Sequence, residues 1–230
     1  MLLAIDTSSL VLSCALAEED RLIAEWTVQR KLTHSEQLIP HMDAMLKEGG
    51  VERKDITAFA CALGPGSFTG LRIGLATAKM AARIWGVPLI GVDTLEGLAW
   101  NMAGAQAFIL PLEDAQRGNV YAALYGAYET MWLEKKAAAA PIDAVIEAAL
   151  RHGGPLIAVG EAADLYKDKL KDAGILLAPP QNRCCRAGSI AMAAWAKWKR
   201  GETADPMTVV PNYIRRSEAE VLWEQRHPEA

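Results

Sequence analysis

Short apolar runs and amphipathic stretches alternate along the first half of the chain. Apolar runs of about four to eight residues bounded by turn residues predict strands, at positions 2–5, 10–17, 22–28, 57–63 and 87–92. Stretches with a helical period predict helices, at positions 33–48, 68–85 and 94–102. Thr33 and Glu36 have the spacing of a capping box at the start of the first helix. The predicted element order is βββαβαβα.

The second half repeats this order of elements, although the amino-acid sequences of the two halves have only weak identity. Strands are predicted at 107–112, 119–125, 129–135, 156–159 and 175–177, and helices at 141–151, 162–173 and 188–200. The stretch 135–140 is interpreted as a solvated connection. Asp6 and Asp114 hold equivalent places, each at the end of the first strand of its half.

Such a duplicated α/β unit is similar to the actin/hexokinase/Hsp70 (ASKHA) superfold. We therefore expect a two-lobed actin-like protein. The predicted divisions are an N-terminal lobe at 1–104, a C-terminal lobe at 105–204 and a C-terminal tail at 205–230.

Composition and charge narrow the functional classes. A hydrophobic fraction of 51% with 23% charged residues is typical of a globular protein. The formal net charge of −4 gives no basic excess for phosphates, so we expect contact with RNA only through another protein. No apolar run approaches the roughly 18 residues of a membrane span, and the first run ends at Asp6 without the pattern of a signal peptide. We expect a cytoplasmic protein without membrane contact.

The four cysteines predict neither disulfides nor a metal site. Cys14 and Cys61 lie in apolar runs, as small core residues do. Cys184 and Cys185 are adjacent, which is poor geometry for a mutual disulfide, and zinc-type spacing is absent from the sequence.

The motif GPGSFTG at residues 64–70 lies between a predicted strand and a predicted helix. A glycine-rich turn at a helix N-terminus is a natural anion site, although the spacing matches neither the Walker A loop nor the dinucleotide fingerprint. The residues of this possible nucleotide or anion loop are Gly64, Gly66, Ser67 and Asp6. The alternative is a tight turn in which Gly70 and Gly74 permit close packing, either on the protein's own sheet or at a subunit interface.

Chemistry of a kinase or a metalloenzyme is poorly supported. The turns after Asp6 and Asp114 lack the glycines expected in phosphate hairpins. Asp6 could hold a hydrated magnesium ion, but we expect it to cap backbone amides instead. His34 and His41 are seven residues apart, roughly 10 Å along a helix, whereas one metal ion needs the His-x-x-x-His spacing. We assign no catalytic and no metal-binding residue.

Five stretches resemble the TsaB family, also called YeaZ, in family order and over nearly the whole chain. They are LAIDTS at 3–8, HSE at 34–36, GPGSFTGLRIG at 64–74, Asp114-Ala115 with Val120-Tyr121, and PNYIR at 211–215. The run through Leu71 and Arg72 is the most specific of them.

The resemblance implies a non-catalytic subunit that binds and activates TsaD, a paralogue that transfers a threonylcarbamoyl group to adenosine beside the tRNA anticodon. TsaD carries the His-x-x-x-His metal site; here His34 is present, but Leu38 stands at the second ligand. TsaD and the ATPase TsaE are the implied partners, and tRNA is reached only through the complex. The chain has no cofactor of its own, ATP being used by the complex. An ATP-binding phosphotransferase is the alternative, and a metalloprotease is a third reading that Leu38 argues against.

Family members pair with TsaD, or with themselves when alone, through the two helices that correspond here to about 33–48 and 68–85. The first helix offers an apolar face and the second a surface of small residues, which would suit a four-helix interface. The predicted partner-binding residues are Leu38, Met42, Met45, Gly70, Leu71, Gly74 and Ala78.

Overall fold

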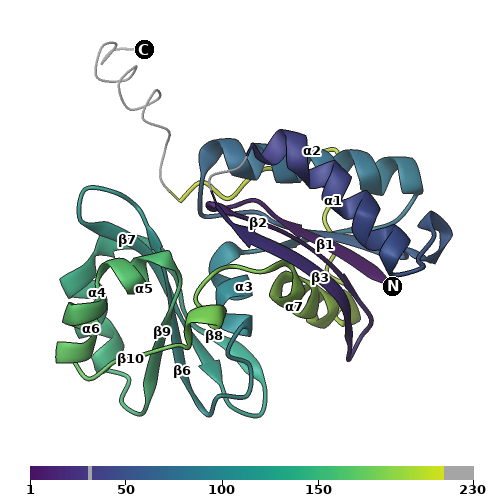
Figure 1. The fold of residues 1–230 in the computed structure, drawn as a ribbon. Coiled ribbons are helices and arrows are strands. Elements are labelled where there is room, and N and C mark those ends of the chain that lie inside the picture. Colours follow the sequence, from purple (N-terminus) through teal and green to yellow (C-terminus); the bar gives the residue numbers. More distant parts are fainter. Residues whose placement is uncertain (31–32, 215–230) are drawn as a thin grey trace, which may run out of the picture.

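Two five-stranded mixed sheets form the framework of the protein (Figure 1). The computed structural model describes residues 1–30 and 33–214 of the 230-residue chain. In spatial order the first sheet contains β3 (Leu22–Gln29), β2 (Val11–Ala17), β1 (Leu2–Asp6), β4 (Ala58–Ala62) and β5 (Leu89–Val92). The second contains β10 (Leu176–Leu177), β9 (Leu156–Val159), β6 (Ala107–Asp114), β7 (Asn119–Ala127) and β8 (Met131–Pro141).

The two sheets have the same connectivity. In each, the first strand pairs antiparallel with the second and parallel with the fourth, and the fifth strand closes the edge beside the fourth. The helices of the described residues are α1 (His34–Glu48), α2 (Phe68–Trp85), α3 (Thr94–Trp100), α4 (Ile142–Leu150), α5 (Glu161–Leu165), α6 (Lys167–Asp172) and α7 (Ala187–Lys199). The predicted duplicated actin-like α/β fold is confirmed.

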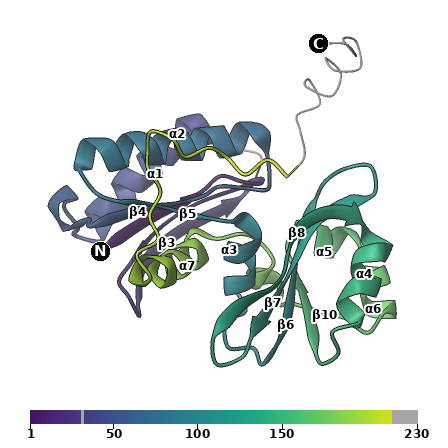
Figure 2. The same cartoon turned by 180° about the vertical axis from the view of Figure 1, so that it is seen from behind.

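The helices and sheets alternate in layers (Figures 1 and 2). Helices α1 and α2 cover one face of the first sheet, while α4, α5 and α6 lie on the outer face of the second. Strand β1 is buried along its whole length because both faces of the sheet are covered. Its alternation sends Leu3 and Ile5 into the core under α1 and α2, and Leu2 and Ala4 into the core between the lobes.

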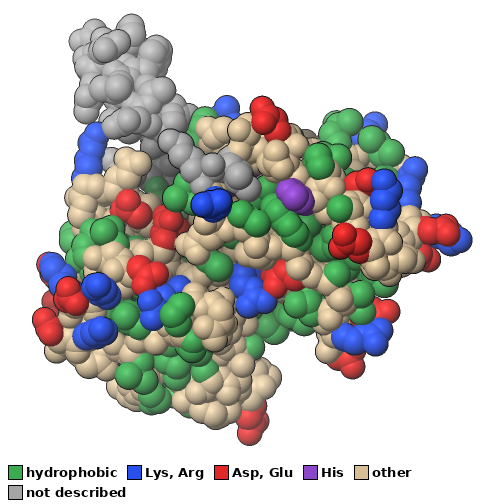
Figure 3. Space-filling model, in the orientation of Figure 1, with side chains coloured by type: hydrophobic (Ala, Val, Ile, Leu, Met, Phe, Trp, Pro, Cys, Tyr) green, Lys and Arg blue, Asp and Glu red, His purple; other side chains and the backbone are tan. Residues whose placement is uncertain are grey.

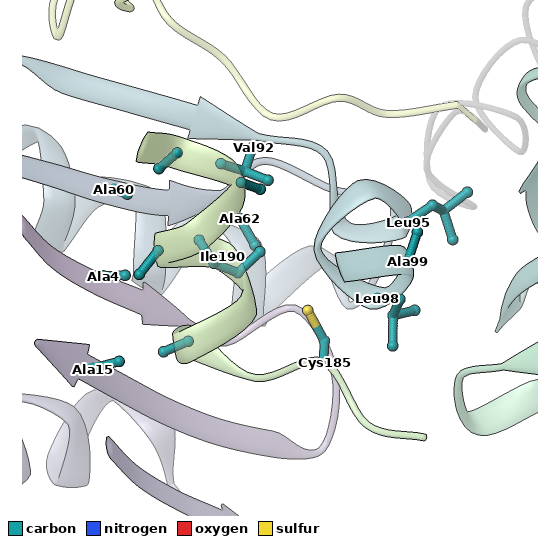
Figure 4. Close-up of a cluster of buried hydrophobic side chains, with 14 of the residues drawn as sticks. Ala4, Ala15, Ala60, Ala62, Val92, Leu95, Leu98, Ala99, Cys185 and Ile190 are labelled. Carbon is teal, nitrogen blue, oxygen red and sulfur yellow. The ribbon is translucent and has the colours of Figure 1, made fainter. Parts of the chain in front are cut away.

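Helix α7 follows the last strand of the second half, yet it packs against the first sheet. Alanines on both sides make this close approach possible, and Figure 4 shows Ala4, Ala15 and Ala60 on the strands facing the helix that carries Ile190. Conversely, α3 follows the first sheet but lies against β6 and β7 of the second as well as against α7. The boundary predicted between residues 104 and 105 therefore separates the strands of the two sheets. It does not separate the helices in the same way, because α3 and α7 each contact the sheet of the other half.

Polar contacts fix the start of α7 on the first sheet. The backbone N–H of Ala187 donates to Ser13 Oγ at 2.9 Å, and that of Gly188 donates to Glu25 Oε1 at 2.9 Å. Arg186 forms an ion pair with the same Glu25 carboxylate. The free amides and positive dipole end of a helix favour a carboxylate at this position.

Several local predictions were wrong. Thr33 occupies the N-cap position of α1, but it makes no side-chain cap hydrogen bond, so the capping box is absent. The stretch 135–140 is not a connection, because β8 continues through it to Pro141 and pairs with β7. The helix predicted at 162–173 is divided into α5 and α6 at Tyr166, whose φ and ψ of −108° and 23° are not helical.

Candidate functional site

The glycine-rich loop packs onto the turn that follows β1. The backbone N–H of Ser67 donates to the carbonyl of Ser8 at 2.6 Å, and Thr7 Oγ1 donates to the carbonyl of Gly70 at 2.7 Å. A Cβ atom added to Gly66 would lie 2.2 Å from the Ser8 carbonyl oxygen, and one added to Gly70 would lie 2.0 Å from that of Thr7. Backbone contact between the loop and the turn thus requires glycine here.

Ser67 serves as the N-cap of α2. Its side-chain oxygen accepts a hydrogen bond from the backbone N–H of Gly70 at 3.3 Å. The amides of Ser67 and Gly70 are therefore both engaged within the protein. On the other side of the loop, Gly64 lies against the chain at 212, where an added Cβ would meet the Asn212 carbonyl oxygen at 2.8 Å. The glycines thus have a packing role, while the anion interpretation of this loop stays a prediction.

Asp6 is wholly buried at the centre of this region. Its Oδ1 accepts a hydrogen bond from the backbone N–H of Ser8 at 3.1 Å, as predicted for an aspartate that caps the following turn. Its Oδ2 has no hydrogen-bond partner among the described residues. Burial raises the pKa of the Asp6 carboxyl above its ordinary value, with the hydrogen bond from the Ser8 backbone opposing the rise.

The equivalent turn in the second half has the same hydrogen bond but a different environment. Asp114 Oδ1 accepts from the backbone N–H of Gln116 at 2.8 Å, yet Asp114 is exposed. The buried acid at this end of β6 is Glu113, which the sequence analysis missed. Burial raises the pKa of Glu113 well above its ordinary value, and the neighbouring Glu161 carboxyl adds to the rise. Because β6 runs two residues past the predicted end at Leu112, Glu113 belongs to a buried strand.

The two histidines of α1 lie in separate contacts. His34 Nε2 is 2.9 Å from the Ser9 carbonyl oxygen, and the ring of His41 stacks on Trp26 with centroids 3.5 Å apart. Leu38, between them, is buried in the core under α1. Within residues 1–30 and 33–214, no three His, Cys, Asp or Glu side chains are grouped to hold a metal ion.

The predicted partner-binding residues lie on the inner faces of their helices, where the chain's own core covers them. All seven are buried in the chain itself, with Leu38 and Leu71 each 1% exposed. The most apolar face of an amphipathic helix packs on its own sheet, and here that face carries Leu38, Met42, Met45, Gly70, Leu71, Gly74 and Ala78. These residues therefore stabilise the monomer.

The outward faces of α1 and α2 carry a different apolar set. Ile39 on α1 is 53% exposed, and Met80 and Ile84 on α2 are 58% and 59% exposed. Figure 3 shows hydrophobic side chains gathered over these two helices. We call Ile39, Met80 and Ile84 the outer apolar set.

A segment that falls almost wholly in the predicted C-terminal tail runs along α2. The backbone N–H of Ala204 donates to the carbonyl of Leu89, Lys79 Nζ donates to that of Val209, and the N–H of Asn212 donates to that of Leu63. We call residues 204–214 the strap. Positions 215–230 of the predicted tail lie outside the described residues.

No helix within the described part of the chain is long and apolar enough to cross a membrane.

Two like-connected sheets, with the glycine-rich loop at the carboxyl ends of β1 and β4, define an actin-like protein. The ROK hexokinase of Thermus thermophilus has this fold, with a TM-score of 0.53 at 11% identity over 87% of this chain and 99% of that one. At that identity the likeness shows the fold alone.

Comparisons with closer proteins show the family. The model described as "TsaD: tRNA N6-adenosine threonylcarbamoyltransferase" matches residues 28–223. The tRNA threonylcarbamoyladenosine biosynthesis protein TsaB of Bacillus subtilis is 33% identical, covering 96% of this chain and 97% of the relative. The Escherichia coli protein of the same name is 30% identical, covering 97% of each. The chain belongs to the TsaB family.

Solved structures agree with this assignment. A crystal structure from Pseudomonas aeruginosa, of a protein described as similar to peptidase YEAZ, has a TM-score of 0.82 at 26% identity and covers 93% of this chain and 99% of that one. YeaZ from the same organism has a TM-score of 0.76 at 25% identity, covering 92% and 98%. The predicted family resemblance is confirmed.

Proposed function

We propose that the chain is a non-catalytic subunit that binds a TsaD-type threonylcarbamoyltransferase and activates it to form threonylcarbamoyladenosine beside the tRNA anticodon. The names of the Bacillus and Escherichia relatives place those proteins in this biosynthesis. The observation that best supports a non-catalytic role is the close packing of the glycine-rich loop on the turn after β1. Asp6 is wholly buried, and the glycines lie against the backbone of Thr7 and Ser8 instead of being free to approach a phosphate.

The outer apolar set is the surface that we propose for the partner. Exposed clusters of apolar side chains mark interaction sites, and two such helices from each subunit would form a four-helix interface. In the absence of TsaD, the same surface would pair two copies of this chain. TsaE joins the complex, which uses ATP and reaches tRNA through the other subunits, and the chain itself holds no cofactor. The complex acts in the cytoplasm.

The decisive assay is threonylcarbamoyl transfer to tRNA by purified TsaD, supplied with its activated substrate, with and without this chain. We expect full transfer only when both proteins are present, and none from this chain alone. Transfer by TsaD at the same rate without this chain would refute the activating role.

Met80→Asp tests the surface. Because Met80 is 58% exposed, a charge there should leave stability within about 0.5 kcal/mol of the unmodified chain and weaken TsaD binding by at least about tenfold. Leu165→Asp is the matched control, since Leu165 is 62% exposed on α5 of the other lobe. Equal effects of the two substitutions on binding, measured by calorimetry, would contradict the assignment.

A phosphotransferase is the alternative function, and the fold is what favours it. An activator of 2-hydroxyisocaproyl-CoA dehydratase with bound ADPNP has a TM-score of 0.51 at 10% identity, but fold alone is weak evidence for function. We expect isolated chain to show no ATP binding by calorimetry. Binding in the micromolar range would revive this alternative.

A further inference from the structure

Arg72 is held in one orientation at the N-terminal end of α2. Its Cζ lies 3.8 Å from the centroid of the Phe68 ring, and its Nε donates to Tyr213 Oη at 3.2 Å. Phe68 and Tyr213 stack on each other with centroids 5.2 Å apart. We call these three residues the arginine–aromatic cluster. A guanidinium on an aromatic face is stabilised by the ring quadrupole, so Arg72 is positioned before any ligand arrives.

The cluster joins two parts of the sequence that are far apart. Phe68 and Arg72 are one turn apart on α2, whereas Tyr213 belongs to the strap, 141 residues after Arg72. The strap is itself fixed to the loop region, because the N–H of Asn212 donates to the Leu63 carbonyl at 2.7 Å and its side chain donates to Asp93 Oδ2 at 3.1 Å. The orientation of Arg72 is thus set by residues that are themselves fixed by hydrogen bonds within the fold.

The guanidinium has no acidic partner among residues 1–30 and 33–214, although such partners are common elsewhere in the protein. Arg21, Arg151 and Arg200 each pair with a glutamate within four residues. Arg72 is exposed, and within the same described residues its Nη1 and Nη2 atoms make no hydrogen bond. The Nη1 and Nη2 atoms together can bind a carboxylate with two parallel hydrogen bonds.

We propose that the arginine–aromatic cluster is an anchor for a carboxylate side chain of the TsaD-type partner, bound in bidentate fashion by Arg72. The proposal rests on the proposed function above. Phe68 and Tyr213 are each 40% exposed, and pre-positioned arginine and aromatic side chains are the types that dominate binding energy at protein interfaces. Two residues of the cluster, Phe68 and Arg72, lie on the same helix as Met80 and Ile84.

A protein carboxylate fits this site better than a nucleotide phosphate. The chain carries a net charge of −4, which disfavours a free polyanion. The aromatic side chains beside Arg72 offer apolar surface of the kind that excludes water around an interfacial ion pair and strengthens it. A nucleotide remains a measurable outcome of the test.

The test compares three variants of the full chain for binding to purified TsaD. Arg72→Ala removes the guanidinium, Arg72→Lys keeps the charge but loses the planar fork, and Arg83→Ala is the matched control. Arg83 is also exposed on α2 and also contacts the strap, through Met207 Sδ at 3.2 Å. Thermal unfolding of each variant measures whether the fold is intact, and limited proteolysis measures whether the strap is released.

We expect Arg72→Ala to weaken TsaD binding by about 30-fold, Arg72→Lys to recover only part of this loss, and Arg83→Ala to have less than about a threefold effect. A charge reversal, Arg72→Glu, should be rescued by one acid-to-lysine substitution on the contact face of TsaD.

Three results would overturn the inference. The first is unchanged TsaD binding by Arg72→Ala with a lower melting temperature or a released strap, which would make the cluster purely structural. The second is ATP binding by the unmodified chain that Arg72→Ala abolishes, which would make the ligand a nucleotide. The third is no binding of TsaD by the unmodified chain, which would refute the proposed function and with it this anchor.

Discussion

Gly70→Ala tests whether the glycines of α2 serve internal packing or a partner. The added Cβ would lie 2.0 Å from the Thr7 carbonyl oxygen, about 1 Å closer than any real Cβ contact. Because that oxygen belongs to the backbone of the turn after β1, relief requires α2 and the first sheet to move apart. Overpacking of this kind costs about 1–3 kcal/mol, and the separation also breaks the hydrogen bond from Thr7 Oγ1 to Gly70, worth about 1 kcal/mol.

The helix itself gains about 1 kcal/mol when glycine becomes alanine. The net expectation for Gly70→Ala is a loss of about 1–3 kcal/mol in the free energy of unfolding. Gly74→Ala is the matched control, because its Cβ would meet Thr7 Oγ1 at 2.3 Å, and a side-chain atom can rotate away. That rotation sacrifices the same hydrogen bond but is offset by the gain in helix propensity, so we expect a change within about 1 kcal/mol of zero.

Urea denaturation followed by circular dichroism measures both variants. Equal stability of Gly70→Ala and the unmodified chain would refute the packing argument. If that stable variant also lost TsaD binding, Gly70 would instead be a partner contact.

Two further predictions concern burial. Leu71→Arg should lower the free energy of unfolding by at least about 3 kcal/mol, because Leu71 is 1% exposed and a charge there has no partner; a folded Leu71→Arg monomer of normal stability in urea would contradict this. Burial raises the pKa of Asp93 from 3.8 to about 6, so the folded state binds the proton of this carboxyl more tightly than the unfolded state does. The free energy of unfolding should therefore fall as the pH rises from about 4 through 6. Relative to Asp93→Asn, the loss should reach up to about 3 kcal/mol. A stability difference between the two proteins that is the same at pH 4 and pH 7 would contradict that assignment.

The strands and helices of the framework were predictable because their signals are local. Strand β4 and the loop after it, for example, combine a short apolar run with glycine and proline, and α2 begins and ends at the expected residues, Phe68 and Trp85. The duplicated order of elements then indicated the fold. Asp6 was also correctly expected to cap the turn that follows it.

Local signals were insufficient where tertiary contacts decide the outcome. The alanines of 137–140 have little strand propensity, but pairing with β7 extends β8 through them. The burial of Glu113 depends on the neighbouring α5 and on the other lobe. The residues adjacent to Glu113 in the sequence do not indicate these contacts.

The expected exposure of the predicted partner-binding residues was wrong for a related reason. An apolar helix face does not show whether it covers its own sheet or a second protein, and in α1 and α2 it covers the sheet. The exposed residues Ile39, Met80 and Ile84 are few, so they gave only a weak signal.

The position of α7 has a consequence for how the chain acquires its structure during synthesis. One face of the first sheet, with Leu2, Ala4 and Ala15, stays uncovered until residues 187–199 have left the ribosome. Contacts between segments that far apart in sequence are slow to form, and exposed apolar strands are prone to aggregation in the meantime. We therefore expect that the N-terminal half does not fold independently and that chaperones recognise a nascent chain that stops before α7.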